Sequence, residues 1–182
     1  MSKIKQTYEL PFKRRYKGKT DYRARLALVK SGLPRVVLRF TSNRAIAELI
    51  KYEAKGDKVL AYATTNDIVK LGWKHSKKNT PACYLLGYMI GKLSAKIKVK
   101  EAVLDLGLHK SSSRVGAFIK GMTDAGLQVP HSEDIIPDEK RIKGEHIINA
   151  AKSIKNKNQF SKVKPDNMAK DFEEIKKKIS GV

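Results

Sequence analysis

The chain is poor in cysteine and in long apolar runs, and each shortage excludes a class of protein. Cys83 is the only cysteine among 182 residues, so neither an internal disulfide nor a cysteine-based metal cluster can form. No apolar run approaches the roughly 18 residues that span a membrane, and we find no secretory apolar core and no lipidation motif. A cytoplasmic, reducing setting is compatible with these absences.

Acidic residues are also scarce relative to basic ones. The chain has 18 Asp and Glu against 39 Lys and Arg, which gives a formal net charge of +21. Self-repulsion on this scale weakens a compact state, so a large polyanion is the expected partner. With 41% hydrophobic and 31% charged residues, most of the chain should still be globular. Its length suffices for one well-buried core with extensions and falls short of two full domains.

Residue patterns that support catalysis are few. Residues 18–20 (Gly-Lys-Thr) match the end of a phosphate-binding loop, but the upstream glycine of that motif falls at Lys13 and no strand precedes it. The four histidines are widely spaced and form no i, i+4 metal pair. Asp105 and His109 could form an acid/base pair, although a turn-forming Asp is commoner. We expect no enzyme activity, cofactor or metal, and keep an RNA-processing enzyme as a minor alternative.

The N-terminal residues 1–19 form a basic arm. They carry seven Lys and Arg against Glu9 and lack apolar periodicity, so we predict that the arm is disordered or extended until it binds a partner. Tyr8, Phe12 and Tyr16 recur every four residues and could stack on bases or sugars. A solvated tail is the alternative. Because the charge continues into the elements that follow, we predict that the arm grips a structured RNA.

Beyond the arm, the sequence predicts an antiparallel meander. Residues 21–30 read as a helix that Thr20 or Asp21 caps and that has Tyr22, Leu26 and Val29 on one face. Three strands are then predicted, the second in preference to a helix because a glycine-containing turn and another apolar run follow it. Their predicted ranges are 34–40, 45–53 and 59–64. Trp73 is expected to be a core or hinge anchor.

The next segments predict a strand and two helices that complete an α/β domain. A long helix over residues 81–98 follows an N-cap at Thr80, and Gly87 and Gly91 would permit close packing on it. Residues 101–106 are mostly apolar, which is typical of a buried parallel strand. A further helix is predicted over residues 115–125. We therefore predict a three-layer α/β/α domain with a mixed sheet, the antiparallel meander plus one parallel strand.

The C-terminal part predicts a helical extension. A helix over residues 145–154 precedes a basic linker, residues 155–164, and a last helix over residues 165–179. Apolar residues form one stripe on this last helix, and the helix must bury that stripe against its own domain or against a neighbouring molecule. The stripe consists of Met168, Phe172, Ile175 and Ile179.

Three further polar and basic loops follow predicted strands or precede predicted helices. They span residues 42–44, 74–79 and 107–114. In the last loop, serine hydroxyls at a helix N-terminus with flanking cations would seat a phosphate, although simple helix capping explains the serines equally well. The candidate RNA-binding residues are Phe12, Lys13, Arg14, Arg15, Tyr16, Lys17, Lys19, Thr20, Tyr22, Arg23, Arg25, Lys30, Arg35, Arg39, Asn43, Arg44, Lys74, His75, Lys77, Lys78, Asn79, Lys110, Ser111, Ser112 and Arg114.

Several separated motifs resemble those of one known family. GKTDYRAR at residues 18–25, NTPA at 79–82, AVLDLGLH at 102–109, and VPHSE with RIKGEH at 129–133 and 141–146 occur in this order. Together they are similar to the archaeal type of the universal ribosomal protein that binds 5S rRNA, numbered eighteen in the large subunit, whose eukaryotic relative is large-subunit protein five. The resemblance covers roughly residues 8–154.

This resemblance implies a structural role rather than an enzymatic one. It implies binding to 5S rRNA in the central protuberance of the cytoplasmic ribosome, with contacts to the large-subunit rRNA and to neighbouring ribosomal proteins. We accordingly divide the chain into a basic N-terminal arm (1–19), an α/β rRNA-binding domain (20–129) and a C-terminal extension with helices (130–182). A non-ribosomal basic nucleic-acid-binding module is the alternative.

Overall fold

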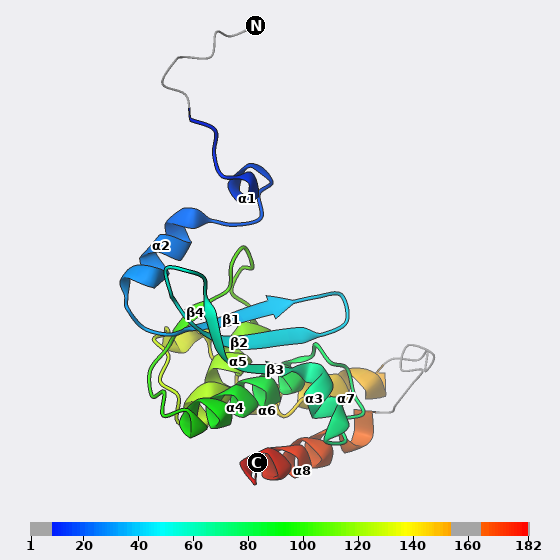
Figure 1. Cartoon of the computed structure of the whole chain (residues 1–182). Coiled ribbons are helices and arrows are strands. Elements are labelled where there is room, and N and C mark those ends of the chain that lie inside the picture. The colour runs from blue at the N-terminus through cyan, green and yellow to red at the C-terminus, as the bar shows by residue number, and fades with distance from the viewer. Residues whose placement is uncertain (1–8, 154–164, 182) are drawn as a thin grey trace, which may run out of the picture.

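The computed structural model describes residues 9–153 and 165–181 (Figure 1). Tyr8, the end of the predicted helix at Ile154 and the predicted linker lie outside the described residues. Four strands form one sheet in the order β3-β2-β1-β4. Their bounds are Arg35–Phe40 for β1, Ala45–Lys51 for β2, Lys58–Thr64 for β3 and Val103–Asp105 for β4.

The sheet is mixed, as the sequence predicted. β1 pairs antiparallel with β2, β2 pairs antiparallel with β3, and β4 pairs parallel with β1. The parallel strand is shorter than expected and lies at the edge of the sheet. Val103 and Leu104 are therefore only half-buried. The prediction of a buried strand, which rested on their apolar character, is wrong for these two residues.

Alternation along the strands separates an apolar face from a polar one. Val36 and Leu38 of β1 face the core together with their β2 partners, Leu49 and Ala47, and all four are fully buried. The arginines of β1 project from the opposite face because they occupy the alternate positions. This pattern fixes the register, since a slip of one residue would turn the arginines into the core.

The helices and 3-10 turns surround this sheet. Their bounds are Lys13–Tyr16 (α1), Tyr22–Lys30 (α2), Thr65–Lys70 (α3), Thr80–Lys96 (α4), Ser113–Asp124 (α5), Glu133–Ile135 (η1), Glu139–Ile142 (α6), Glu145–Ser153 (α7), Pro165–Asn167 (η3) and Met168–Ser180 (α8). α4 and α5 cover the apolar face, whereas α2 lies over the opposite face beside β4 (Figure 1). None of the helices in the described ranges is long and apolar enough to cross a membrane.

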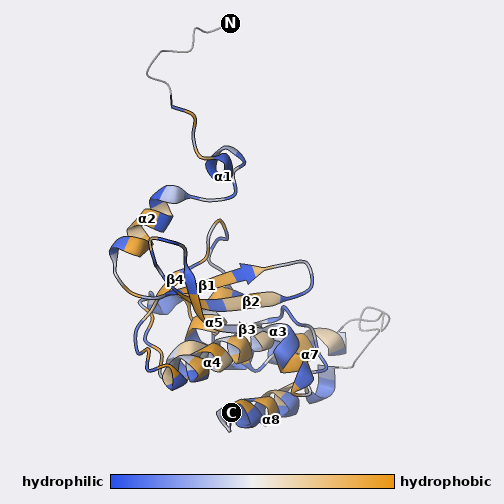
Figure 2. Cartoon of the chain, in the orientation of Figure 1, coloured by the Kyte–Doolittle hydropathy of each residue, from blue (hydrophilic) through white to orange (hydrophobic). Residues whose placement is uncertain are grey.

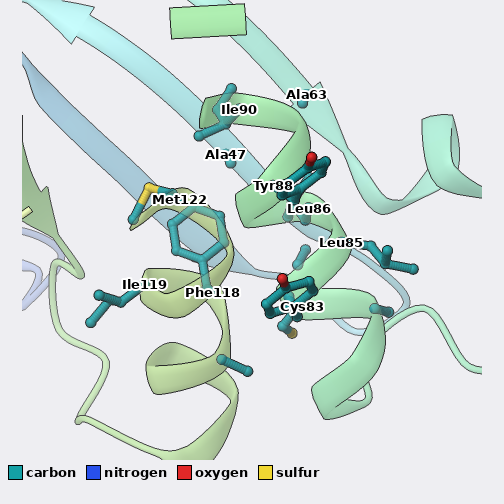
Figure 3. Close-up of a cluster of buried hydrophobic side chains, with 14 of the residues drawn as sticks. Ala47, Ala63, Cys83, Leu85, Leu86, Tyr88, Ile90, Phe118, Ile119 and Met122 are labelled. Carbon is teal, nitrogen blue, oxygen red and sulfur yellow. The ribbon is translucent and has the colours of Figure 1, made fainter. Parts of the chain in front are cut away.

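The core lies where α4 crosses α5 beneath the sheet. Figure 3 shows this cluster, in which Ala47 and Ala63 of the sheet, Leu86 and Ile90 of α4 and Phe118 of α5 are all buried. Trp73 is buried as well, and its Nε1 donates a hydrogen bond of 3.0 Å to the carbonyl of Ser76. The prediction that Trp73 anchors the core is confirmed.

The predicted close packing on α4 is confirmed and is very tight. A Cβ atom at Gly87 would lie 2.1 Å from the carbonyl oxygen of Phe118, and one at Gly91 would lie 2.6 Å from the Cβ of Ala125. The predicted cap of α4 was wrong by one residue, because the side chain of Asn79, not that of Thr80, accepts the hydrogen bond from the amide of Ala82.

α8 packs against its own domain. The whole predicted stripe of α8 is buried, and the ring of Phe172 lies 5.3 Å from that of Tyr84 on α4. Polar contacts join the rest of α8 to the domain: Asp171 contacts His75, Ser180 contacts Tyr88, and Lys178 donates to the carbonyl of Leu71. Of the two destinations open to this helix from sequence, the structure selects the chain's own domain.

The arm and α2 depart from prediction in two respects. Residues 13–16 form a single helical turn rather than an extended segment, and Arg14 and Thr20 hydrogen bond across the bend that follows. Asp21 caps α2, but the predicted apolar face of this helix is not buried, since Leu26 is 55% exposed. Ala24, Arg25 and Leu28 of α2 instead line a cleft that Leu104 and Asp105 of β4 also line.

Candidate nucleic-acid interface

A cleft of about 620 Å³ separates the arm and α2 from the end of β4. Arg14, Lys19 and Arg25 line one wall, and Arg39 and His109 line the other. In Figure 2 the single turn of α1 is strongly hydrophilic and stands well away from the body of the domain. The positive groups on both walls and the open mouth suit an anionic polymer rather than an enclosed small molecule.

A chain of alternating charges joins the two walls on the polar face of the sheet. Arg25 and Arg35 both place a guanidinium nitrogen 2.7 Å from the same oxygen of Asp57. Arg35 also lies 3.0 Å from Asp105, and Arg39 lies 2.9 Å from the other oxygen of Asp105. We call Arg25, Asp57, Arg35, Asp105 and Arg39 the Arg–Asp ladder. It links α2, the β2–β3 turn, β1 and β4.

The ladder holds Asp105 as a carboxylate. Burial alone would raise the pKa of Asp105, but the hydrogen bond and charge of Arg39, the amide of Gly107 and the charge of Arg35 together lower that pKa below its usual value. Within residues 9–153, no hydrogen bond joins Asp105 to His109, whose ring packs edge-on against Phe40 at 5.8 Å. An ionised Asp105 clamped by two arginines argues against the acid/base pair considered from sequence.

Most candidate RNA-binding residues are exposed and free to face a partner. This set comes from the arm, the outer side of α2 and the tips of the three loops. It consists of Phe12, Lys13, Arg14, Arg15, Tyr16, Lys17, Lys19, Arg23, Lys30, Asn43, Arg44, Lys74, Lys110 and Ser111. Thr20, Tyr22, Arg25 and Arg39 are half-buried close to the cleft.

The second basic loop contributes mainly to the fold. The side chain of His75 is only 3% exposed, stacks edge-on against Trp73 and lies 2.8 Å from a carboxylate oxygen of Asp171. Asn79 caps α4, Lys77 donates to the side chain of Asn66, and Lys78 donates to the carbonyl of Ser42. Among the candidate RNA-binding residues of this loop, Lys74 is the one whose side chain is exposed.

The third loop presents the N-terminus of α5. Ser112 occupies the N-cap position, but its hydroxyl makes no capping hydrogen bond with any described residue, so the capping explanation of the serines is not realised there. Arg114 lies over the ring of Phe40 at 4.9 Å. Lys110 and Ser111 are exposed beside this first turn, where backbone N–H groups favour an anion.

Two features of the interface were not found from sequence. Arg35 is among the predicted RNA-binding residues, but its side chain is 2% exposed and pairs with Asp57 and Asp105 in the ladder. Asp57 lies in the glycine-containing turn between the second and third predicted strands, and its local sequence indicates no more than a hairpin turn. The pairing of Asp105 with these arginines could have been predicted from the strand pattern. β1 places Arg35 and Arg39 on either side of Val37 on its polar face, and Val37 pairs with Asp105 across the parallel strands.

The chain is similar to large-subunit ribosomal proteins. A family model described as "Ribosomal large subunit proteins 60S L5, and 50S L18" matches residues 6–101, which include most of the arm, α2, three strands and α4. The Large ribosomal subunit protein uL18 of Methanothermobacter thermautotrophicus is 44% identical over an alignment of 182 residues, which covers 94% of this chain and 95% of that protein. The second match also covers most of the C-terminal extension.

Proposed function

Because the chain belongs to the family of large-subunit ribosomal proteins that comprises 60S L5 and 50S L18, it is a structural constituent of the large ribosomal subunit, and we propose that it binds 5S rRNA. In this proposal it attaches the 5S rRNA to the large-subunit rRNA in the central protuberance and contacts neighbouring ribosomal proteins there. Like the family, it has a structural rather than a catalytic role and acts in the cytoplasm as part of a ribonucleoprotein.

The observation that carries the proposal is the basic cleft beneath the arm. Arg14 and Lys19 face Arg39 across it, and further exposed cations, Lys13, Arg15 and Lys17, continue the positive surface along the arm. Phosphate contacts of this kind supply most of the affinity for RNA and fix the register of the protein on it.

Aromatic rings in the arm add a second kind of contact. Phe12 and Tyr16 are 71% and 81% exposed, and Phe12 packs on Tyr22 with ring centroids 5.1 Å apart. Large exposed rings beside arginines suit stacking on unpaired bases, which is how proteins commonly read structured RNA. Recognition should therefore depend on RNA shape more than on base sequence.

A titration of 5S rRNA against excess tRNA, repeated at several salt concentrations, tests the proposal. We expect selective binding of 5S rRNA and a steep decline of log K with log salt, with a slope of about one unit for each phosphate neutralised. Equal affinity for tRNA, 5S rRNA and duplex DNA would favour the alternative, a basic nucleic-acid module without this target.

A further inference from the structure

α2 carries the arm but is weakly anchored by apolar packing. All of its residues are described, and none is buried. Its strand neighbour is β4, across the cleft, where Leu28 faces Leu104 and Leu106. Because apolar packing holds α2 only weakly, a polar contact must fix its position. The ion pair of Arg25 with Asp57, at 2.7 Å, is such a contact.

Asp57 connects α2 to a buried residue of the sheet. One oxygen of its carboxylate accepts hydrogen bonds from both Arg25 and Arg35. Arg35 is almost completely buried, and Asp105 pairs with its other terminal nitrogen. A buried, doubly paired guanidinium is a rigid point because breaking its contacts would leave a charge without compensation inside the protein. Asp57 transmits that rigidity to a helix at the surface.

The ladder also fixes the separation of the two walls of the cleft. It begins at Arg25 on the α2 wall and ends at Arg39 and Asp105 on the β4 wall. Arg39 donates in addition to the backbone carbonyl of Asp105 at 2.7 Å, which ties this end to the strand itself.

The arm follows α2 closely. The ring of Phe12 packs on that of Tyr22, and Arg14 donates a 2.9 Å hydrogen bond to the hydroxyl of Thr20, just before the helix cap. A rotation of α2 would therefore carry Arg14 and Lys19 with it, away from the opposite wall of the cleft.

We propose that Asp57, acting with Arg35, is a positioning residue for RNA binding: it sets the place of α2 and so presents the arm to the RNA. The inference rests on the proposed function. It makes a prediction opposite in sign to that of simple electrostatics, since removing an acidic residue from a protein that binds RNA should otherwise strengthen binding.

The first experiment compares Asp57→Asn with Glu53→Gln in the full chain. Both variants remove one negative charge from the same hairpin, but among the described residues Glu53 takes part in no ion pair. We expect Asp57→Asn to weaken binding to 5S rRNA about tenfold, Asp57→Glu to recover part of the loss, and Glu53→Gln to leave affinity unchanged or slightly increased. Equal affinities for Asp57→Asn and Glu53→Gln would overturn the inference.

A double-mutant cycle with Lys19→Ala separates positioning from a general loss of structure. If Asp57 acts through the arm, the double variant loses less affinity than the sum of the two single losses. Strictly additive losses would contradict this route. Arg35 keeps its pairing with Asp105 in Asp57→Asn, so the domain should stay folded by circular dichroism. Global unfolding would assign Asp57 to stability and also contradict the inference.

A second measurement needs no RNA. Spin labels at Lys17→Cys and Lys110→Cys, on exposed positions of the arm and of the third basic loop, report the distance across the cleft. Burial raises the pKa of the Cys83 thiol to about 12, so Cys83 should remain unlabelled. We expect Asp57→Asn to broaden the distance distribution, and an unchanged distribution would refute the inference. Failure of the wild-type chain to prefer 5S rRNA would instead refute the proposed function.

Discussion

At the scale of single residues, the crossing of α4 and α5 depends on glycines, which have no side chain. The backbone of each helix occupies the space that a Cβ of the other would fill, since a Cβ at Gly121 would lie 2.2 Å from the carbonyl oxygen of Tyr84, and one at Gly87 would meet Phe118 equally closely. Backbone cannot move away as the end of a flexible side chain can. The two helices are therefore interlocked by glycine, and alanine, the best helix former, is excluded there.

We predict that Gly87→Ala lowers the free energy of unfolding by about 3 kcal/mol despite the better helix propensity of alanine. Urea unfolding followed by circular dichroism measures this difference. Gly181→Ala is the control, because its Cβ would meet no atom closer than 3.7 Å and Gly181 has an ordinary negative φ. The control should change stability by less than about 0.5 kcal/mol. Equal effects of the two variants would contradict the packing argument.

Asp105 gives a residue-scale prediction about pH. Its pKa is lowered in the folded protein from the ordinary 3.8, so its ion pairs stabilise the fold fully above that value and lose this contribution as pH falls toward the folded pKa. The difference in free energy of unfolding between wild type and Asp105→Asn should therefore shrink as pH falls below about 4. Urea unfolding of the RNA-free protein between pH 3 and pH 6 measures it. If this difference in free energy of unfolding were independent of pH, the ladder would not depend on the ionised carboxylate of Asp105.

At the scale of elements, α8 is attached by an apolar stripe and by polar ties to the segment between α3 and α4. Phe172 of the stripe packs on Tyr84, while Asp171 reaches His75 beside Trp73. The second basic loop, which the sequence predicts to bind RNA, thus seats the C-terminal helix. A basic loop can serve both purposes, because the imidazole of His75 points inward while Lys74 remains exposed.

We predict that Phe172→Ala releases α8. Truncating a buried Phe typically costs about 3–5 kcal/mol, and much of this loss should appear as reduced protection of the α8 amides in hydrogen exchange. Glu174→Ala, on the exposed side of the same helix, should leave that protection unchanged. Undiminished protection in Phe172→Ala would mean that the polar ties suffice to hold the helix.

At the scale of the whole molecule, charge and fold are divided between parts. The described arm is exposed and basic, whereas the buried cluster comes mainly from the sheet, α4, α5 and α8. A net charge of +21 opposes compaction, and placing many of the cations outside the core limits that cost. The arm should accordingly be dispensable for folding and important for binding.

We predict that deleting residues 1–19 weakens binding to 5S rRNA by several kcal/mol and lowers the salt slope, since seven cations are lost. The remaining domain should keep its circular dichroism spectrum, because no side chain of the described arm belongs to the core. Unchanged affinity would show that the loops, and not the arm, form the RNA interface. Global unfolding would show that the arm supports the fold.

Local pattern alone determined much of this protein. The glycine-containing turn and the apolar run that follow β2 predicted it as a strand despite its helix-favouring residues. Periodicity predicted the buried stripe of α8, and the charge excess predicted a polyanionic partner. These features depend on residues close together in the chain, where the geometry of a strand or helix fixes which side chains share a face. The motifs carried the family resemblance for the same reason.

Tertiary structure decided what pairs across long separations. It placed Asp57 and Asp105 between three arginines, turned His75 toward Asp171 and kept α8 on its own domain. A basic residue in a loop has the same local pattern whether it meets a phosphate or a buried carboxylate. Whether such a carboxylate lies beside the basic residue depends on how distant segments pack. The sequence therefore predicted the kind of interface, whereas the fold determined which cations remain free to form it.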